Sequence, residues 1–372
     1  MDAQLKTWRE ALHRIPELGM EEVKTTAYLK KELEAMGYHP QPLLETGLYV
    51  YVDAGKQTTL AFRSDIDGLP IIEETKLPFA STHEGVMHAC GHDGHMTALL
   101  GFAKALKEEK SLPRNILLIF QPAEESPGAA RFVVQSGLLE KHHVEAIFGI
   151  HLMPQIPEGV IACKPGSLMA KCGEIDVKVT GKGAHAGLAQ DGIDSLMIAS
   201  TLIMQYQQII ARMKSPFEPA IINIGAITGG TARNSVAAVT EFHGTVRCYN
   251  DAMFDHLIHA IDQLHKGTEK IYGCTIEWQC PPLYPAVIND EDLFKHLQSI
   301  QDVEVLKEPL MLSEDFSYYQ KVVKGLFVFV GTGTKEHQSG LHTGTFDFNE
   351  QVLEKVITMY CNIVHTYKGD LK

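Results

Sequence analysis

The segment NILLIFQPAEE, residues 115–125, contains an unbroken apolar run that ends in polar and acidic residues. Short apolar runs of this kind are typical of strands that are buried on both faces of a parallel sheet. On either side of this segment, the apolar spacing predicts helices over 95–110 and 129–136 and strands over 59–63 and 146–150. Strands that alternate with helices predict an α/β domain with a mixed, mostly parallel sheet flanked by helices.

The two ends of the chain extend this pattern. Two helices open the chain, and the second, which stops near Gly37, is expected to bury Val23, Ala27 and Leu33 on one face. Further predicted elements are a strand over 48–52, a helix over 290–300, a strand over 326–330 and a helix over 349–367.

The stretch from Gly173 to Pro282 has a different rhythm, because paired strands dominate it. Its predicted elements are strands over 174–180, 220–227, 239–249 and 275–279 and helices over 195–213 and 251–272. This order predicts a compact α+β unit inserted into the α/β domain. We therefore expect one domain over 1–173 and 283–372 and an inserted domain over 174–282.

Composition narrows the class of protein. A chain of 372 residues exceeds what one hydrophobic core usually holds, so two domains are expected. The net charge of -13 argues against nucleic acid or an acidic membrane as a partner. The polar N-terminus MDAQLKTWRE and the seven irregularly spaced cysteines predict a cytoplasmic protein without a disulfide framework.

Three predicted strands end in residues with reactive side chains. These ends read RSDIDG (63–68), QPAEES (121–126) and GIH (149–151). Ligands of open α/β sheets bind beyond the carboxyl ends of the strands. The Asp, Glu and His side chains at these ends therefore predict one shared site.

The segment HACGHDGH, residues 88–95, has the highest density of metal-binding side chains. Cys90 and His92 can both reach a metal, and their mixture of sulfur and nitrogen donors suits zinc or a similar divalent ion. The alternative is an ordinary loop that opens a helix, with Asp93 as its cap and the histidines in solvent.

The adjacent pair Glu124 and Glu125 is the second signal. One carboxylate can bind a metal while its neighbour accepts a proton from the attacking water. Taken alone, the pair is more often an ordinary acidic start of a helix, which is favourable to the helix dipole. His342, in a glycine-rich loop, is informative only together with the other clusters. Ser126 and Ser313 lack the neighbours of a nucleophile elbow, which argues against a serine hydrolase.

Together these segments resemble a family of metallo-amidohydrolases that includes aminoacylases, hippurate hydrolases, auxin-conjugate hydrolases and zinc carboxypeptidases. The motifs that carry the resemblance run in the family's order along nearly the whole chain: LHRIPELG, RSDIDGLP, HACGHDGH, QPAEE, GIH, GKGAHAG, GGTARNSV, LSEDFSYY and GLHTGTFDF. The pair HACGHDGH and QPAEE is highly specific, whereas GIH alone is weak.

The resemblance implies a site with two divalent metal ions, of zinc, manganese or cobalt. It implies that Glu124 is the general base that activates water and that Asp67 supports the site. Many relatives have a metal-binding histidine where this chain has Asp65. The implied metal ligands are Cys90, which bridges the ions, with His92, Glu125, His151 and His342.

The inserted domain resembles the family's lid, which usually also forms a homodimer interface. The resemblance implies that His185 approaches the scissile carbonyl, and that Asn234 and Arg247 help to bind the substrate. The alternative for His185 is an ordinary turn residue. The alternative for Arg247 is a surface charge on a strand.

Within the family, RSDIDGLP and HEGVMHACGHDGHM resemble most closely the deacetylase branch of lysine biosynthesis. This branch implies hydrolysis of N-acetyl-LL-diaminopimelate, a small molecule whose free amine Glu314 or Asp315 could face. Three alternatives stay open at this point: hydrolysis of hippurate or another N-acyl amino acid, a metal-containing binding protein without catalysis, and an interaction protein that uses the lid surface.

Overall fold

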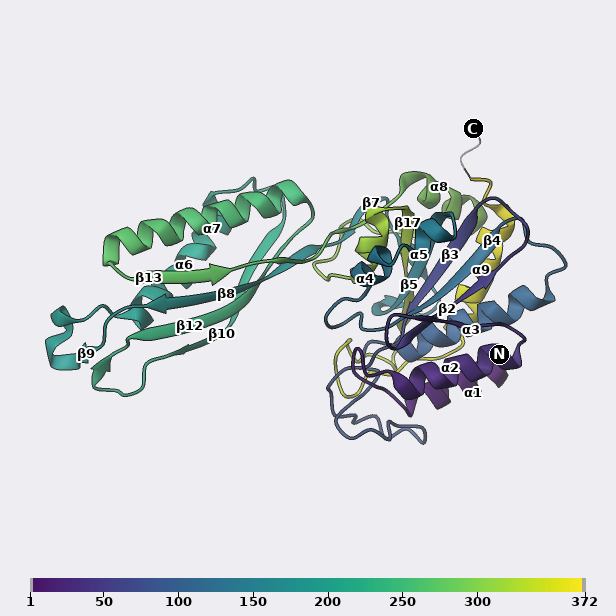
Figure 1. The fold of residues 1–372 in the computed structure, drawn as a ribbon, viewed down its shortest axis with the longest axis horizontal. Helices are drawn as coiled ribbons and strands as arrows, with labels where there is room; N and C mark the ends of the chain where they lie inside the picture. The colour runs from purple at the N-terminus through teal and green to yellow at the C-terminus, as the bar shows by residue number, and fades with distance from the viewer. Residues whose placement is uncertain (1–2, 370–372) are drawn as a thin grey trace. The chain divides into compact units, whose positions relative to one another are not determined.

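The computed structural model, which describes residues 3–369, places the apolar run of 115–121 in strand β4 (Asn115–Gln121), where every residue is buried. In parallel ladders, β4 pairs with β3 (Thr59–Asp65), β3 pairs with β5 (Val144–Pro157), and β5 pairs with β17 (Lys324–Gly333). These four strands form the centre of an eight-stranded sheet in the order β1-β2-β4-β3-β5-β17-β6-β16 (Figure 1). The predicted mixed, mostly parallel sheet is confirmed.

Short strands close both sides of this sheet. On one side β2 (Gly47–Val52) runs antiparallel to β4, and β1 (Gln41–Leu43) runs antiparallel to β2. On the other side β6 (Ile161–Cys163) runs antiparallel to β17, and β16 (Glu304–Val305) runs parallel to β6. The two outermost strands are only three and two residues long, which limits the backbone that an edge exposes.

Helices cover the sheet and bury a large apolar core. Alternate residues of the central strands, such as Phe62, Leu118 and Phe148, form one core cluster with apolar residues of five helices. Those helices are α1 (Ala3–His13), α2 (Val23–Ala35), α3 (His92–Glu108), α8 (Glu291–Ile300) and α9 (Val352–Thr366).

The buried face of α2 differs from the sequence prediction. Thr25, Leu29 and Leu33 are buried, whereas Val23 is 67% exposed and Ala27 is also exposed. Residues spaced by four lie on one stripe of a helix, and a shift of two residues moves a side chain about 200° around the axis. The prediction was right for Leu33 and wrong for Val23 and Ala27.

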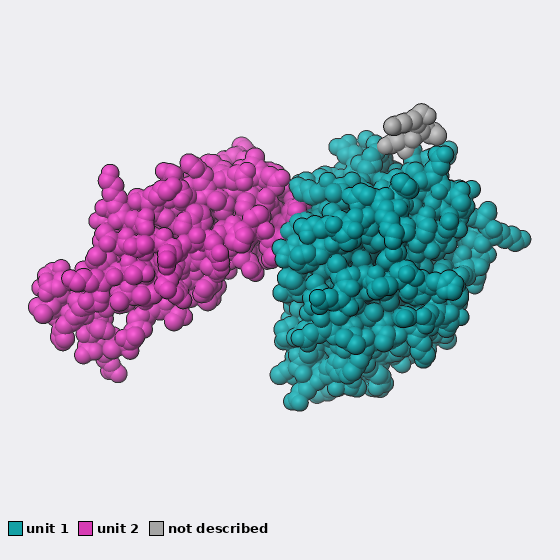
Figure 2. All heavy atoms as spheres, viewed as in Figure 1, with its two compact units in different colours: residues 1–168, 288–309, 315–372 teal, residues 169–287, 310–314 magenta. Residues whose placement is uncertain are grey.

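The chain divides into two units (Figure 2). Unit 1 consists of Met1–Leu168, Ile288–Pro309 and Asp315–Lys372, and unit 2 consists of Met169–Val287 and Leu310–Glu314. The division lies a few residues outside the boundaries expected at 174 and 282. The short second segment of unit 2 is a feature that no sequence pattern indicated.

Unit 2 is a sheet with two helices on one face. Its main strands run antiparallel in the order β10-β12-β8-β13, with the short strand β14 (Pro282–Tyr284) also paired with β8. Apolar residues of the sheet pack with apolar residues of both helices, including Val177, Phe242, Leu202 and Leu257. These elements are β8 (Lys171–Thr180), β10 (Ala220–Gly229), β12 (Val239–Cys248), β13 (Thr275–Gln279), α6 (Ser195–Arg212) and α7 (Asp251–Tyr272).

The remaining elements are short. They are α4 (Ala130–Gln135), α5 (Leu138–Lys141), β7 (Gly166–Met169), β9 (Ala184–His185), β11 (Ser235–Val236), β15 (Val287–Asn289) and the 3-10 helices η1 (Ala186–Asp191) and η2 (Asp315–Lys321). Over residues 3–369, no helix has the length and apolarity that a bilayer crossing requires.

Candidate metal and catalytic site

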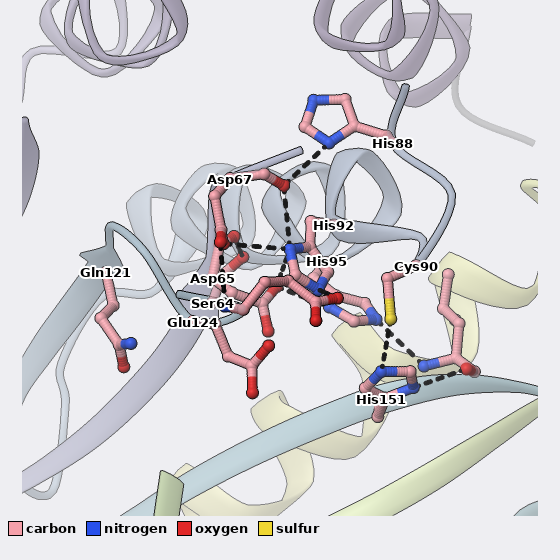
Figure 3. A network of polar contacts seen from close by, with 12 residues as sticks. Ser64, Asp65, Asp67, His88, Cys90, His92, His95, Gln121, Glu124 and His151 are labelled. Carbon is pink, nitrogen blue, oxygen red and sulfur yellow. Dashed lines mark hydrogen bonds and ion pairs between the residues drawn. The ribbon is translucent and has the colours of Figure 1, made fainter. Parts of the chain in front are cut away.

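The carboxyl ends of three neighbouring strands in unit 1 bring the predicted residues together (Figure 3). Asp65 is the last residue of β3, Glu124 follows the end of β4, and His151 lies within β5. The loop before α3 supplies Cys90, and His92 is the first residue of that helix. Since parallel strands end at the same edge of a sheet, residues from distant parts of the chain meet here.

Cys90, His92 and His151 form the first group of possible metal ligands. Their ligand atoms lie within 4.8 Å of one another, and all three residues are buried. Cys90 Sγ is 3.3 Å from His151 Nε2. The group therefore offers one sulfur and two nitrogen donors at one point, a set that suits zinc and similar ions.

Cys90, Glu125 and His342 form a second group that shares the thiol with the first. Glu125 Oε1 lies 3.1 Å from His342 Nε2 and 4.0 Å from His92 Nε2. His342 adopts a left-handed backbone with φ of 58°, and its side chain is half exposed. Two groups that share one sulfur can hold two ions close together.

Hydrogen bonds orient both buried histidines toward this point. His151 Nδ1 donates to the carbonyl oxygen of Leu152 at 2.7 Å, and His92 Nδ1 donates to the carbonyl oxygen of Asp67 at 2.9 Å. A carbonyl oxygen only accepts, so each Nδ1 carries the proton and each Nε2 is left to bind a ligand. Metal-binding histidines are held in the same way.

The surroundings of the Cys90 thiol and of His92 favour a bound cation. Burial raises the pKa of the Cys90 thiol well above its usual range, and the nearby Glu125 and Glu124 raise it further. A bound divalent ion reverses this preference and stabilises the thiolate. His92 Nε2 is buried with no hydrogen-bond partner among the described residues, which is costly unless a ligand binds it. The residues therefore fit a metal centre.

The two histidines differ in charge when only protein groups surround them. Burial lowers the pKa of His151 to about 3, with a further contribution from His95. Burial also opposes the charge on His92, but Asp65 and Asp67 outweigh it and raise the pKa of His92 to about 10. A metal ion held by His92 would therefore have to displace a proton, whereas His151 would already be neutral.

Glu124 is buried beside the possible metal ligands. Its carboxylate falls within 4.8 Å of the ligand atoms of His92 and Glu125, and its Oε1 accepts a weak 3.4 Å hydrogen bond from the amide of Asp315. Asp67 lies next to it: Asp67 Oδ2 accepts from the Glu125 amide at 3.0 Å, and Asp67 Oδ1 is 3.2 Å from His92 Nδ1. Asp67 thus contacts both His92 and the turn that carries Glu124.

The carboxylate of Asp65 already has two partners. One oxygen is 2.7 Å from His95 Nδ1 and the other accepts from Arg63 at 2.8 Å. Burial alone raises the pKa of Asp65, but His92, His95 and Arg63 outweigh it and hold that pKa well below its usual range. Sequence reasoning missed His95, although its spacing of three from His92 places both on one side of α3.

The suggestion that Asp315 faces a substrate amine is wrong. Asp315 is buried, and its carboxylate accepts from Arg63 at 2.7 Å, from Gln121 at 2.7 Å and from the amide of Ala130 at 2.8 Å. These three donors occupy both oxygens. Asp315 therefore supports the sheet end and is not available to a substrate.

The three candidates of unit 2 fall into two places. His185 lies in β9, opposite Ser235 of β11, and the amide of Ala186 donates to the carbonyl oxygen of Asn234. His185 and Asn234 are both exposed. Arg247 lies near the far end of β12, and its guanidinium donates to the carbonyl oxygen of Met311 at 2.6 Å.

Comparisons with known proteins show which family the chain resembles. The sequence model of peptidase family M20/M25/M40 matches residues 61–366. An N-acetyldiaminopimelate deacetylase of Bacillus subtilis is 37% identical over 370 residues, covering 96% of this chain and 97% of the relative. An IAA-amino acid hydrolase ILR1-like 4 of Arabidopsis thaliana is 35% identical, covering 98% of this chain and 86% of the relative.

Solved structures include members of the same family and proteins with the same fold. A putative aminohydrolase from methicillin-resistant Staphylococcus aureus superposes with a TM-score of 0.91 and 32% identity, covering 98% of this chain and 96% of the other. A dinuclear metal-binding peptidase of the M20 family from Bacillus subtilis superposes with a TM-score of 0.84 and 30% identity, covering 97% and 96% of the two chains.

Proposed function

Because the chain belongs to peptidase family M20/M25/M40, we propose that it hydrolyses N-acetyl-LL-diaminopimelate to LL-diaminopimelate and acetate in lysine biosynthesis. As a family member it is a metal-dependent hydrolase of amide bonds, and its cofactor is a pair of metal ions. A binding protein without catalysis and a pure interaction protein are thereby set aside. The choice of an acetylated substrate follows the similarity to the Bacillus deacetylases.

One observation carries the proposed mechanism: two groups of ligands share Cys90, and the buried Glu124 lies beside them. Cys90, His92 and His151 would hold one ion, and Cys90, Glu125 and His342 would hold the other. Such ions, when bound, polarise an amide carbonyl and make water more acidic. Zinc, manganese and cobalt all suit this mixture of sulfur, nitrogen and oxygen donors.

Glu124 is the proposed general base. Its carboxylate takes a proton from the attacking water and then gives it to the nitrogen of the departing amine. Asp67 holds His92 in place and fixes the amide of Glu125, so it acts on the site without touching the substrate. Burial of Glu124 keeps competing water away from its carboxylate.

Three residues of unit 2 are the proposed substrate contacts. His185 donates to the oxygen of the scissile carbonyl, where charge develops in the transition state. Asn234 and Arg247 bind the polar groups of the amino acid. Exposure of His185 and Asn234 supports this role, because their donors are accessible to a ligand.

A homodimer formed through unit 2 is part of the proposal. The edge strand β10 exposes Ile221 and Ile227, and α6 exposes Met197 and Met204. An unpaired edge beside exposed apolar side chains is a surface that a second copy can cover.

The substrate test compares acetate release from N-acetyl-LL-diaminopimelate with benzoate release from hippurate. Metal-stripped enzyme is reloaded in turn with zinc, manganese and cobalt before each assay. Metal-restored turnover of the acetylated substrate alone supports the proposal. Preference for hippurate contradicts it and favours another N-acyl amino acid as substrate, a second candidate supported by similarity to the Arabidopsis hydrolase.

A further inference from the structure

The segment LHRIPELGMEE, residues 12–22, has no role in the reaction described above. Its last residue, Glu22, is the N-cap residue of α2, but its side chain makes no capping hydrogen bond to that helix. The side chain is fully buried and makes no ion pair among the described residues. A buried carboxyl is costly unless hydrogen bonds compensate it, so its contacts indicate its role.

The Glu22 carboxyl contacts the turn that carries the proposed general base. Glu22 Oε1 accepts from the amide of Ala123 at 2.8 Å, and Oε2 accepts from Thr46 Oγ1 at 2.5 Å. Ala123 is buried with a left-handed φ of 50°, a conformation that a residue with a Cβ adopts only at a cost. The hydrogen bond from its amide helps to hold that conformation.

A second observation shows how closely the segment follows this turn. A Cβ added to Gly19 would meet the carbonyl oxygen of Ser126 at 2.3 Å and the Cβ of Ala123 at 2.9 Å. The glycine therefore permits a backbone approach that any side chain would prevent. Contact with the turn thus involves two positions of the segment, Gly19 and Glu22.

The contacts fix Glu124 from both sides in the chain. The amide before it, of Ala123, donates to Glu22, and the amide after it, of Glu125, donates to Asp67. The carbonyl oxygen of Ala123 accepts from the amides of Gly128 and Ala129 at 3.1 and 2.9 Å. Glu124 therefore lies between two peptide groups whose orientation is set by carboxylates.

We propose that Glu22 is a positioning residue for Glu124 and acts through the amide of Ala123. This inference rests on the proposed role of Glu124 as general base. Proton transfer requires hydrogen-bond distance between the base and the attacking water. Loss of the Glu22 contact frees Ala123 to leave its left-handed conformation, which displaces Glu124 while the metal ligands keep their own contacts.

The test uses the full-length, metal-loaded enzyme with N-acetyl-LL-diaminopimelate, or with hippurate if that is the substrate cleaved. Glu22→Ala should lower kcat about 10- to 100-fold, since a shift of about 1 Å costs that much, with KM and metal content unchanged. Glu22→Gln keeps an oxygen that accepts from Ala123 and should restore most of kcat. If Glu22→Ala does not fold, Glu22→Asp, whose side chain is one methylene too short, replaces it.

Glu17→Ala is the matched control from the same segment. The Glu17 carboxylate accepts from the amide and hydroxyl of Thr25 at 2.9 and 3.0 Å and does not touch the turn. This variant should lose thermal stability but keep kcat. A folded Glu22→Ala enzyme with normal kcat, or an equal loss in Glu17→Ala, would overturn the inference. An active Glu124→Gln enzyme would instead overturn the proposed general base, so the two failures are distinguishable.

Discussion

At the scale of single residues, the site brings together acidic groups whose negative charges repel one another unless a cation is bound. Burial raises the pKa of the Cys90 thiol well above its usual range, and the nearby carboxylates of Glu125, Glu124 and Asp65 raise it further. The free energy gained when ions neutralise this charge contributes to folding, since the unfolded chain offers no such arrangement.

Metal binding should therefore stabilise the folded protein. Adding zinc to stripped enzyme at about 100 times its dissociation constant stabilises it by about 2.7 kcal/mol, so the melting temperature should rise by several degrees. Cys90→Ala should abolish this rise. Cys163→Ala, which changes another buried cysteine of unit 1, should retain it. Thermal scans with and without zinc measure both, and an equal rise in all three proteins contradicts the assignment of Cys90.

Removal of the Glu124 carboxylate should stop the reaction and leave the metal in place. Glu124→Gln should lower kcat by about 10²- to 10⁴-fold, the usual contribution of a general base. Metal content by atomic absorption should match the unchanged enzyme, because the proposed ligands are other residues. Turnover near the normal rate in a metal-replete variant would rule out the proposed base.

The buried carboxyl of Glu22 makes stability depend on pH. Burial raises its pKa to about 7, above the ordinary value of 4.5. The folded state then binds a proton more tightly than the unfolded state. The stabilisation is complete below pH 4.5 and is lost as the pH rises through 7.

Glu22→Gln cannot ionise, so this loss should disappear. Denaturant titrations of metal-free protein should show normal enzyme losing up to about 3 kcal/mol relative to Glu22→Gln between pH 5 and pH 8. Parallel pH curves for the two proteins would show that the Glu22 carboxyl does not titrate in this range.

At the scale of elements, the positions of long segments were predicted well from the sequence. The buried face of the helix α2 was predicted poorly. Apolar runs identify β4 and β17 because both faces of these strands are buried. In α2 the polar Thr25 occupies the buried stripe, where it donates to the carbonyl oxygen of Ile15 at 3.1 Å, and an apolar pattern cannot find such a residue.

The corrected face of α2 gives a direct test. Leu29→Ala should lower the free energy of unfolding by about 2–5 kcal/mol, because Leu29 is fully buried. Val23→Ala should change it by less than about 0.5 kcal/mol, because Val23 is mostly exposed. Denaturant midpoints measure the contrast, and similar losses in both variants would contradict the observed orientation.

Part of the site could be predicted because several of its residues lie close together in the sequence. Cys90 and His92 are two residues apart, and Glu124 and Glu125 are adjacent, so residue type and spacing indicate a ligand set. The support around them could not be predicted in the same way. His95 contacts Asp65, and Arg63 contacts Asp315, 252 positions away in sequence.

At the scale of the whole molecule, the proposed dimer depends on one surface of unit 2. Met204→Glu should convert a dimer to monomers, since it places a charge on the exposed apolar side of α6. Glu218→Lys is a charge-changing control outside α6 and β10 and should leave the mass unchanged. Light scattering after gel filtration measures the molar mass of each protein. A monomer mass for the protein without substitutions would contradict the proposed dimer.

The division of the chain has a consequence for synthesis on the ribosome. Strand β17 lies inside the sheet between β5 and β6, yet it begins at Lys324, long after β5 ends at Pro157. At ordinary rates of translation this gap lasts on the order of 10 to 30 s. Most of unit 2 emerges in that interval and can fold first. During this time the edge of β5 that later pairs with β17 has no partner. The nascent chain is therefore most exposed to aggregation, and most in need of a chaperone, just before β17 emerges.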